Sequence, residues 1–132
     1  MKTNTDITVY NRTTIDRENV YVRATVVGVF WEDSEAINRL QSGLENADKA
    51  TVFVSFGAGF SKEMVEPKEF VKDPENTMTF APGDLVVKGI VEDEITSEKD
   101  LKIKYDYVRQ IVSADKNDFG SKKMQHYELG LR

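Results

Sequence analysis

The sequence predicts a mainly β protein: a small β-barrel or sandwich with one short α-helix at about 97–106 and a long excursion at 33–49. Short β-prone runs alternate with clusters of turn-forming residues along the chain, which is typical of such folds. The most β-prone run, Leu85–Val91, is apolar on both faces, as a strand buried in a small barrel would be. The turn signal Pro82-Gly83-Asp84 stands directly before it. A chain of 132 residues suits one core, so we expect 1–132 to form a single domain.

The N-terminal part of the chain is predicted to form a β-hairpin. Ile7–Tyr10 alternates in polarity and is interpreted as a short edge strand. Residues 11–19 are polar and rich in turn formers, so we expect them to form the hairpin tip. The run 20–31 is the longest β-prone stretch, and Gly28 within it is expected to let the strand bend.

The segment 33–49 interrupts the series of strands. Residues 35–41 fit a helical turn that brings Ile37 and Leu40 together, and they fit a strand equally well, so both alternatives remain open. Long loops in compact domains are usually functional or disordered. The segment is acidic on balance, because it carries Asp33, Glu35, Glu45 and Asp48 against Arg39 and Lys49.

The rest of the chain is predicted to supply the remaining strands. Pro67 suits the first position of a short helical turn. Before and after it, Met64, Val65 and Phe70 are available to cover a barrel mouth. The strands are expected at 50–56, 85–91, 107–113 and 124–131.

One helix is predicted in this half of the chain, at about 97–106. Ser97 can cap its N-terminus, and Asp100 stands at the position from which a side chain can reach back. Leu101, Tyr105 and Val108 recur at helical spacing, so one stripe of the helix can lie against the barrel.

The sequence contains no arrangement typical of an active site. His126 is the only histidine, and a lone histidine in a strand is more often structural than catalytic. The adjacent carboxylates of Glu92-Asp93-Glu94 lack the spacing of a metal site. The chain also has no cysteine. We therefore expect no enzymatic activity, no cofactor and no catalytic, cofactor-binding or metal site.

A nucleic-acid-binding module of the OB type is an alternative from a different class. Lys104, Tyr105, Tyr107 and Arg109 could form its stacking face. The net charge of −5 argues against wrapping duplex DNA, which requires clustered lysine and arginine. No apolar run approaches the roughly 20 residues that span a bilayer, so no membrane partner is expected.

The order of the parts resembles that of a known protein class. A long β pair, a polar excursion, a strand, a glycine turn with a strand, a short helix and two final strands follow one another. The segments that carry the resemblance most strongly are Phe80…Gly83-Asp84-Leu85-Val86-Val87-Lys88-Gly89 with Ile95-Thr96-Ser97, and Asn117-Asp118-Phe119-Gly120-Ser121…Met124-Gln125-His126-Tyr127. This arrangement resembles small proteins of the head-to-tail connector region in tailed bacteriophages and prophages of Gram-positive bacteria, and it is similar to head-completion or stopper proteins. Tyr127 stands where that class would have a tryptophan.

The resemblance implies a barrel with one helix that assembles as a ring beneath the portal. It implies that the protein is made in the host cytoplasm and resides in the virion at the head–tail junction. The implied partners are neighbouring copies of the chain, portal or adaptor proteins, tail proteins, and packaged DNA that passes without tight binding. In stoppers, the loop between the second and third main strands points into the channel. That loop corresponds to 33–49 here, so its candidate residues are Asp33, Glu35, Arg39, Glu45, Asp48 and Lys49.

The contacts between ring subunits are expected at edge strands, because their unpaired backbone groups can be matched by a neighbour. We expect the strands at 7–10 and 124–131 to be such edges. The candidate contact residues are Ile7, Val9, Met124, His126 and Tyr127. A tail-completion or minor capsid protein is an alternative of the same class, and a binding module for nucleic acid or a host protein is the alternative of another class.

Overall fold

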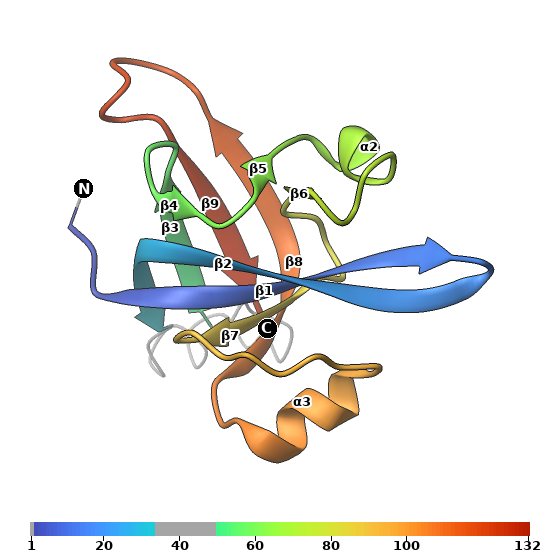
Figure 1. Cartoon of the computed structure of the whole chain (residues 1–132). Helices are drawn as coiled ribbons and strands as arrows, with labels where there is room; N and C mark the ends of the chain where they lie inside the picture. Colours follow the sequence, from blue (N-terminus) through green and yellow to red (C-terminus); the bar gives the residue numbers. More distant parts are fainter. Residues whose placement is uncertain (1, 34–49) are drawn as a thin grey trace, which may run out of the picture.

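Six antiparallel strands close into a β-barrel in the computed structural model, which describes residues 2–33 and 50–132 (Figure 1). The barrel order is β1-β7-β8-β9-β3-β2, and β2 pairs with β1 to close it. The fold is therefore mainly β, as predicted. The elements are β1 Thr5–Ile15, β2 Glu18–Asp33, β3 Ala50–Ser55, β4 Gly59–Phe60, β5 Glu63–Met64, α2 Pro67–Phe70, β6 Thr77–Met78, β7 Leu85–Lys88, α3 Glu98–Lys104, β8 Val108–Asn117 and β9 His126–Leu131.

The hairpin of β1 and β2 is longer than the sequence predicted, and its far end projects from the barrel (Figure 1). The strands stay paired out to Ile15 and Glu18, and the turn consists of Asp16 and Arg17, both with positive φ. The predicted hairpin tip at 11–19 does contain the turn, but most of these residues continue the paired strands. Polar residues can extend a two-stranded arm because solvent and cross-strand bonds satisfy them, as in the 3.1 Å bond from Thr14 Oγ1 to Asn19 Oδ1.

The predicted bend at Gly28 is confirmed. The register shifts there, with Thr5 opposite Val29 but Ile7 opposite Val26, and Gly28 has a φ of 84°. Its N–H donates to Asp6 Oδ1 at 2.9 Å. This bulge turns β2 so that its first part pairs with β1 and its last four residues pair with β3.

Closure of the barrel removes the edges that the sequence analysis assigned. At 7–10, β1 pairs with β2 on one side and β7 on the other, and Ile7 and Val9 are fully buried in the core. β9 likewise pairs with both β3 and β8. The prediction of edge strands at 7–10 and 124–131 is therefore wrong, because closure satisfies the backbone of these strands on both sides.

The predicted helix is confirmed as α3, and its N-terminus is capped by Ser97, whose Oγ accepts from the Asp100 N–H at 3.3 Å. Leu101 is fully buried in a second apolar cluster outside the main core. That cluster joins the helix to β1, β7 and β8 through Tyr10, Leu85, Val87, Ile95, Leu101 and Val108. The predicted helical turn at Pro67 is confirmed as α2.

A buried polar network joins β1 to the turn before β7. Asp84 is 2% exposed, and its carboxylate accepts from the Arg12 N–H at 2.9 Å, the Ala81 N–H at 3.0 Å and Asn11 Nδ2 at 2.8 Å. Asn11 also donates to the Thr79 carbonyl at 2.6 Å and accepts from the Thr79 N–H at 3.3 Å. These bonds fix the point where the barrel ends and the projecting hairpin begins.

Burial raises the pKa of Asp84 to about 6, against the opposing effect of its hydrogen bonds and Arg12. A carboxyl group with a raised pKa binds its proton more tightly when folded, so its contribution to stability is full below about pH 4 and is lost as the pH rises to about 6. We expect the free energy of unfolding of the wild type, relative to Asp84→Asn, to fall by about 3 kcal/mol across this range. Urea denaturation at pH 4 and pH 7 measures it, with the exposed Asp118→Asn as a control. If the stability of the wild type relative to Asp84→Asn instead rose between pH 4 and pH 7, the prediction would be contradicted.

Candidate functional site

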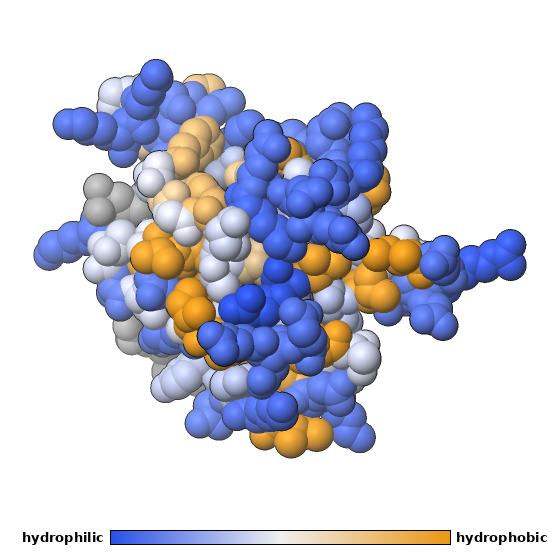
Figure 2. Space-filling view, in the orientation of Figure 1, coloured by the Kyte–Doolittle hydropathy of each residue, from blue (hydrophilic) through white to orange (hydrophobic). Residues whose placement is uncertain are grey.

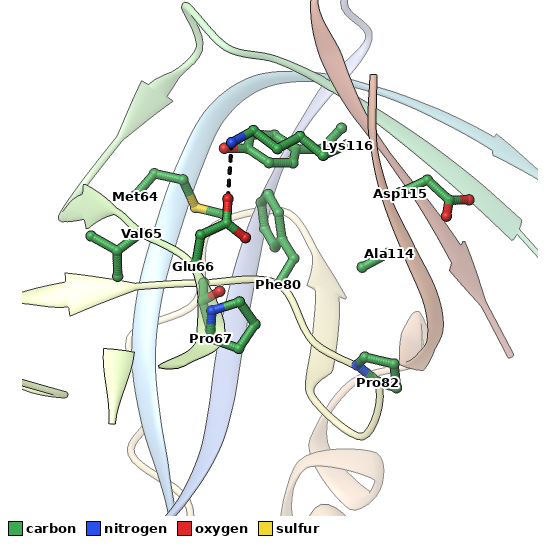
Figure 3. Close-up of a pocket in the computed structure, with 11 residues that line it drawn as sticks. Met64, Val65, Glu66, Pro67, Phe80, Pro82, Ala114, Asp115 and Lys116 are labelled. Atoms are coloured by element: carbon green, nitrogen blue, oxygen red, sulfur yellow. Dashed lines mark hydrogen bonds and ion pairs between the residues drawn. The ribbon is translucent and has the colours of Figure 1, made fainter. Parts of the chain in front are cut away.

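The candidate site is a groove of about 190 Å³ on the side of the barrel (Figure 3). Three parts of the chain that are distant in sequence form it: the segment from β5 into α2, the segment between β6 and β7, and β8 with the neighbouring β9. The groove is lined by Met64, Val65, Glu66, Pro67, Thr79, Phe80, Pro82, Ala114, Asp115, Lys116 and Tyr127.

The apolar side of the groove is a cluster of aromatic rings. The Phe80 and Tyr127 rings meet edge to face, with centroids 5.3 Å apart and an interplanar angle of 73°. The Phe60 ring packs against both of these rings, and the centroid of the Phe56 ring lies 4.7 Å from that of Tyr127. Edge-to-face pairs of this kind stabilise one arrangement of the rings, so this side of the groove has a defined shape.

Short-range pairing holds the segment from β5 into α2 against the barrel. β5 runs parallel to β6, with Met64 opposite Met78, and the Val65 N–H donates to the Met78 carbonyl at 2.9 Å. Pro67 then begins α2, whose Phe70 is 2% exposed. Met64 packs against the barrel core, so this segment covers part of the barrel as the sequence suggested.

An ion pair crosses the rim of the groove, where Lys116 Nζ lies 2.9 Å from Glu66 Oε1 (Figure 3). The bond to Glu66 raises the pKa of Lys116, so the amine stays charged. The same amine lies 5.9 Å from the centroid of the Phe56 ring. Burial raises the pKa of Tyr127, so its phenol stays protonated at neutral pH.

Thr79 links the groove to the buried polar network. Its side chain is 3% exposed, and its Oγ1 has no hydrogen-bond partner among the described residues. With a charged amine, a protonated phenol and apolar walls, the groove can hold an apolar group with a polar rim. It does not offer an activated nucleophile beside a base, the arrangement that covalent catalysis needs.

The predicted contact residues at the end of the chain, Met124, His126 and Tyr127, differ in their surroundings. Tyr127 lines the groove, whereas Met124 is 68% exposed on the loop between β8 and β9. The Nδ1 atom of His126 lies 2.9 Å from the Met124 carbonyl oxygen, and its Nε2 atom lies 3.1 Å from Asn117 Nδ2. These contacts fit a ring that is protonated at Nδ1 and holds the ends of β8 and β9 together.

The outer wall of the barrel carries a second, more open depression of about 420 Å³ beside His126. Phe30, Phe53 and His126 line it from three adjacent strands, together with Lys2. The Phe53 ring centroid lies 6.2 Å from that of Phe30 and 5.9 Å from that of His126.

Of the residues proposed for a stacking face, Tyr105 and Arg109 line one open depression of about 260 Å³, whereas Tyr107 is not part of its lining. The Tyr105 hydroxyl donates to Asp93 Oδ2 at 2.8 Å, and Lys104 pairs with the same carboxylate at 3.5 Å. Tyr107 instead lies 5.2 Å from Lys88 Nζ, which also lies 5.6 Å from the Trp31 ring. The two tyrosines therefore have separate partners.

Most of the predicted channel-loop residues lie outside the described residues, namely Glu35, Arg39, Glu45, Asp48 and Lys49. Asp33 is described as the last residue of β2, opposite Ala50, and its Oδ1 accepts from Trp31 Nε1 at 2.9 Å. Within residues 2–33 and 50–132 there is no cluster of three or more metal-ligating side chains. The described helices include none with the length and apolar character needed to cross a membrane.

Comparison with known proteins places the chain in one family. Residues 2–131 match a family of unknown function, DUF6751. The chain belongs to this family. No curated protein and no solved structure matches it.

Sequence reasoning did not identify the groove, because its walls come from positions spread between residues 64 and 127. The available signals were Pro67, which starts α2, and the pairing of the β-prone runs that bring Phe80 and Tyr127 together. Neither signal shows from sequence alone that the two segments meet.

We expect the groove to depend on its rings and little on its ion pair. Phe80→Ala removes a side chain that is 5% exposed and should lower the free energy of unfolding by about 3–5 kcal/mol. Lys116→Ala breaks an exposed ion pair and should change the free energy of unfolding much less than Phe80→Ala does. Urea denaturation of the two variants and the wild type measures both values. Equal losses would contradict the prediction, because they would show that the rim pair contributes as much as the ring cluster.

Proposed function

We propose that this chain is a structural component of a virion that joins the capsid portal to the tail, as a head-completion, stopper or adaptor ring subunit that closes the DNA channel. The observation that carries the proposal is the closed six-stranded barrel with α3 inserted between β7 and β8. This is the architecture that the resemblance in element order implies. In this proposal the protein resides at the head–tail junction.

The charge of the chain supports a conduit role. A protein that lines a DNA channel should let phosphates pass rather than hold them, and a net charge of −5 favours weak contact. The connection between β2 and β3, residues 34–49, occupies the place in element order of the loop that reaches the channel in stoppers. The proposed partners are copies of the chain, portal, adaptor and tail proteins, and packaged DNA that passes without tight binding.

Deleting the coding sequence from the genome that carries it tests this role. We expect heads to form without attached tails, or to lose their DNA, because the junction is not completed. Electron microscopy and nuclease-protected DNA in the particle fraction measure these two outcomes, and a second copy supplied in trans should restore both. Normal tailed particles from the deletion strain, or a genome without virion genes, would overturn the proposal.

The depression formed by Phe30, Phe53 and His126 favours a second candidate function, a module that stacks nucleobases. Adjacent rings on a barrel wall can stack successive bases of a single strand, and Lys2 lies at their border. The acidic net charge opposes it, so it ranks second.

Single-stranded DNA binding by the purified chain separates the two candidates. Under the leading proposal we expect little binding, and no difference between the wild type, Phe53→Ala and the exposed control Val71→Ala. If affinity is high, falls steeply with salt and is lost in Phe53→Ala alone, the stacking module is the better description. Fluorescence anisotropy of labelled single-stranded DNA at two salt concentrations measures this affinity and its salt dependence.

A further inference from the structure

We propose that the loop between β8 and β9, residues 118–125, docks through Phe119 into the groove of a second copy of this chain. We call this segment the knob loop. The inference rests on the proposed function, because a ring needs a contact between copies, and it names that contact.

The knob loop presents an apolar tip to solvent. Phe119 is 81% exposed and Met124 is 68% exposed, and both lie on a loop that extends beyond the strands at the upper left of Figure 1. In Figure 2, hydrophilic and hydrophobic residues lie side by side in this region. An exposed phenylalanine on a protruding loop is typical of a contact surface when a matching partner surface exists.

Local hydrogen bonds hold the knob loop in shape. The Met124 N–H donates to the Ser121 carbonyl at 2.9 Å, and Gly120 has a φ of 80° that suits glycine. At the base of the loop, the Phe56 N–H donates to the Gln125 carbonyl at 3.2 Å. A loop that is ordered before binding loses little entropy on docking, so it can act as a rigid knob.

The groove has the size and lining for one aromatic side chain. Its volume of about 190 Å³ is below the roughly 300–1,000 Å³ of ordinary small-molecule sites, which favours a single side chain as the occupant. Phe80 and Tyr127 already meet edge to face in it, and a further ring from another chain can add to that cluster. Met64 and the two prolines supply the remaining apolar wall.

The charges around the two surfaces are complementary. The knob loop carries Lys122 and Lys123 against Asp118, so it is positive on balance. The segment from β5 through α2 carries Glu63, Glu66 and Glu69 against Lys68, so it is negative on balance. All of these side chains are exposed, and they can pair across a contact between copies.

Phe119 does not line the groove of its own chain. Lys116 at the groove rim pairs with Tyr127, and the next pair, Asn117 with His126, leads directly into the loop. The pairing at the end of β8 therefore continues into the loop, and Phe119 is 81% exposed there. Because knob and groove are different surfaces, repeated docking joins copies head to tail, and the rotation between copies decides whether they close as a ring.

Sedimentation velocity over a range of protein concentrations tests the contact. We expect the wild-type mass to rise above 15.0 kDa, and Phe119→Ser to weaken association by at least about tenfold. Ile103→Ser removes another exposed apolar side chain, on α3, and should leave association unchanged. A wild type that stays monomeric at every concentration, or an equal effect of both variants, would overturn the proposal.

Disulfide trapping locates the contact, because the chain contains no cysteine of its own. Mixing Ser121→Cys, which keeps Phe119, with Val65→Cys under mild oxidation should give a heterodimer that a mixture of Ile103→Cys with Val65→Cys does not give. The charges are tested in the same way: Glu66→Lys should weaken association with the wild type, and the pair Lys122→Glu with Lys123→Glu should restore association with Glu66→Lys. Equal trapping in both mixtures, or no rescue by charge exchange, would contradict the contact.

A lipid surface is the other occupant that an apolar tip with two lysines could suit. Flotation with vesicles of phosphatidylserine and phosphatidylcholine tests it. Phe119-dependent flotation by a chain that is monomeric in solution would overturn the contact between copies, and absence of flotation would support it. Failure of self-association leaves the result of the gene deletion unaffected, so the two proposals can fail separately.

Discussion

The buried hydrogen-bond network around Asn11 and Asp84 is the constraint on which the rest of the structure depends. Asn11 lies where β1 leaves the barrel, and Asp84 ends the turn before β7, so their contact sets the place of the projecting hairpin relative to the most buried strand. Asn11 also binds both backbone groups of Thr79, which lines the groove. Loss of this network would leave several buried hydrogen-bond donors unpaired at once. Each unpaired buried donor lowers the stability of the fold.

Closure of the barrel decides how this protein can contact others. With β1 and β9 paired on both sides at the positions that the sequence marked as edges, strand addition is not open to them. At these positions contact can be made only by side chains, whereas residues 11–15 of β1 pair with β2 alone and keep a free edge on the projecting hairpin. β8 supplies two surfaces of side chains, because Ala114 and Lys116 line the groove and the strand then runs into the loop that holds Phe119.

The parts that sequence predicted well are those with a local cause. Leu85, Val86 and Val87 are buried on both faces, Ser97 caps α3, and the strand bends at Gly28, because each depends on a residue's own preferences or its near neighbours. The extent of the hairpin, the burial of Asn11, the closure at Ile7 and the groove beside Phe80 depend on partners far along the chain. Asn11 is polar and followed by turn formers, so no local pattern indicates that it binds Asp84.

The chemistry of the groove favours association over reaction. A reactive lysine needs a lowered pKa, whereas the bond to Glu66 raises that of Lys116 and keeps its amine charged. Tyr127 is likewise held in its protonated form by burial. What remains is a shaped apolar surface with charged side chains at its rim, which is the anatomy of a contact between proteins: an apolar centre excludes water and the rim charges select the partner. The structural role that we propose requires such a surface, and the groove lies on the wall of a closed barrel.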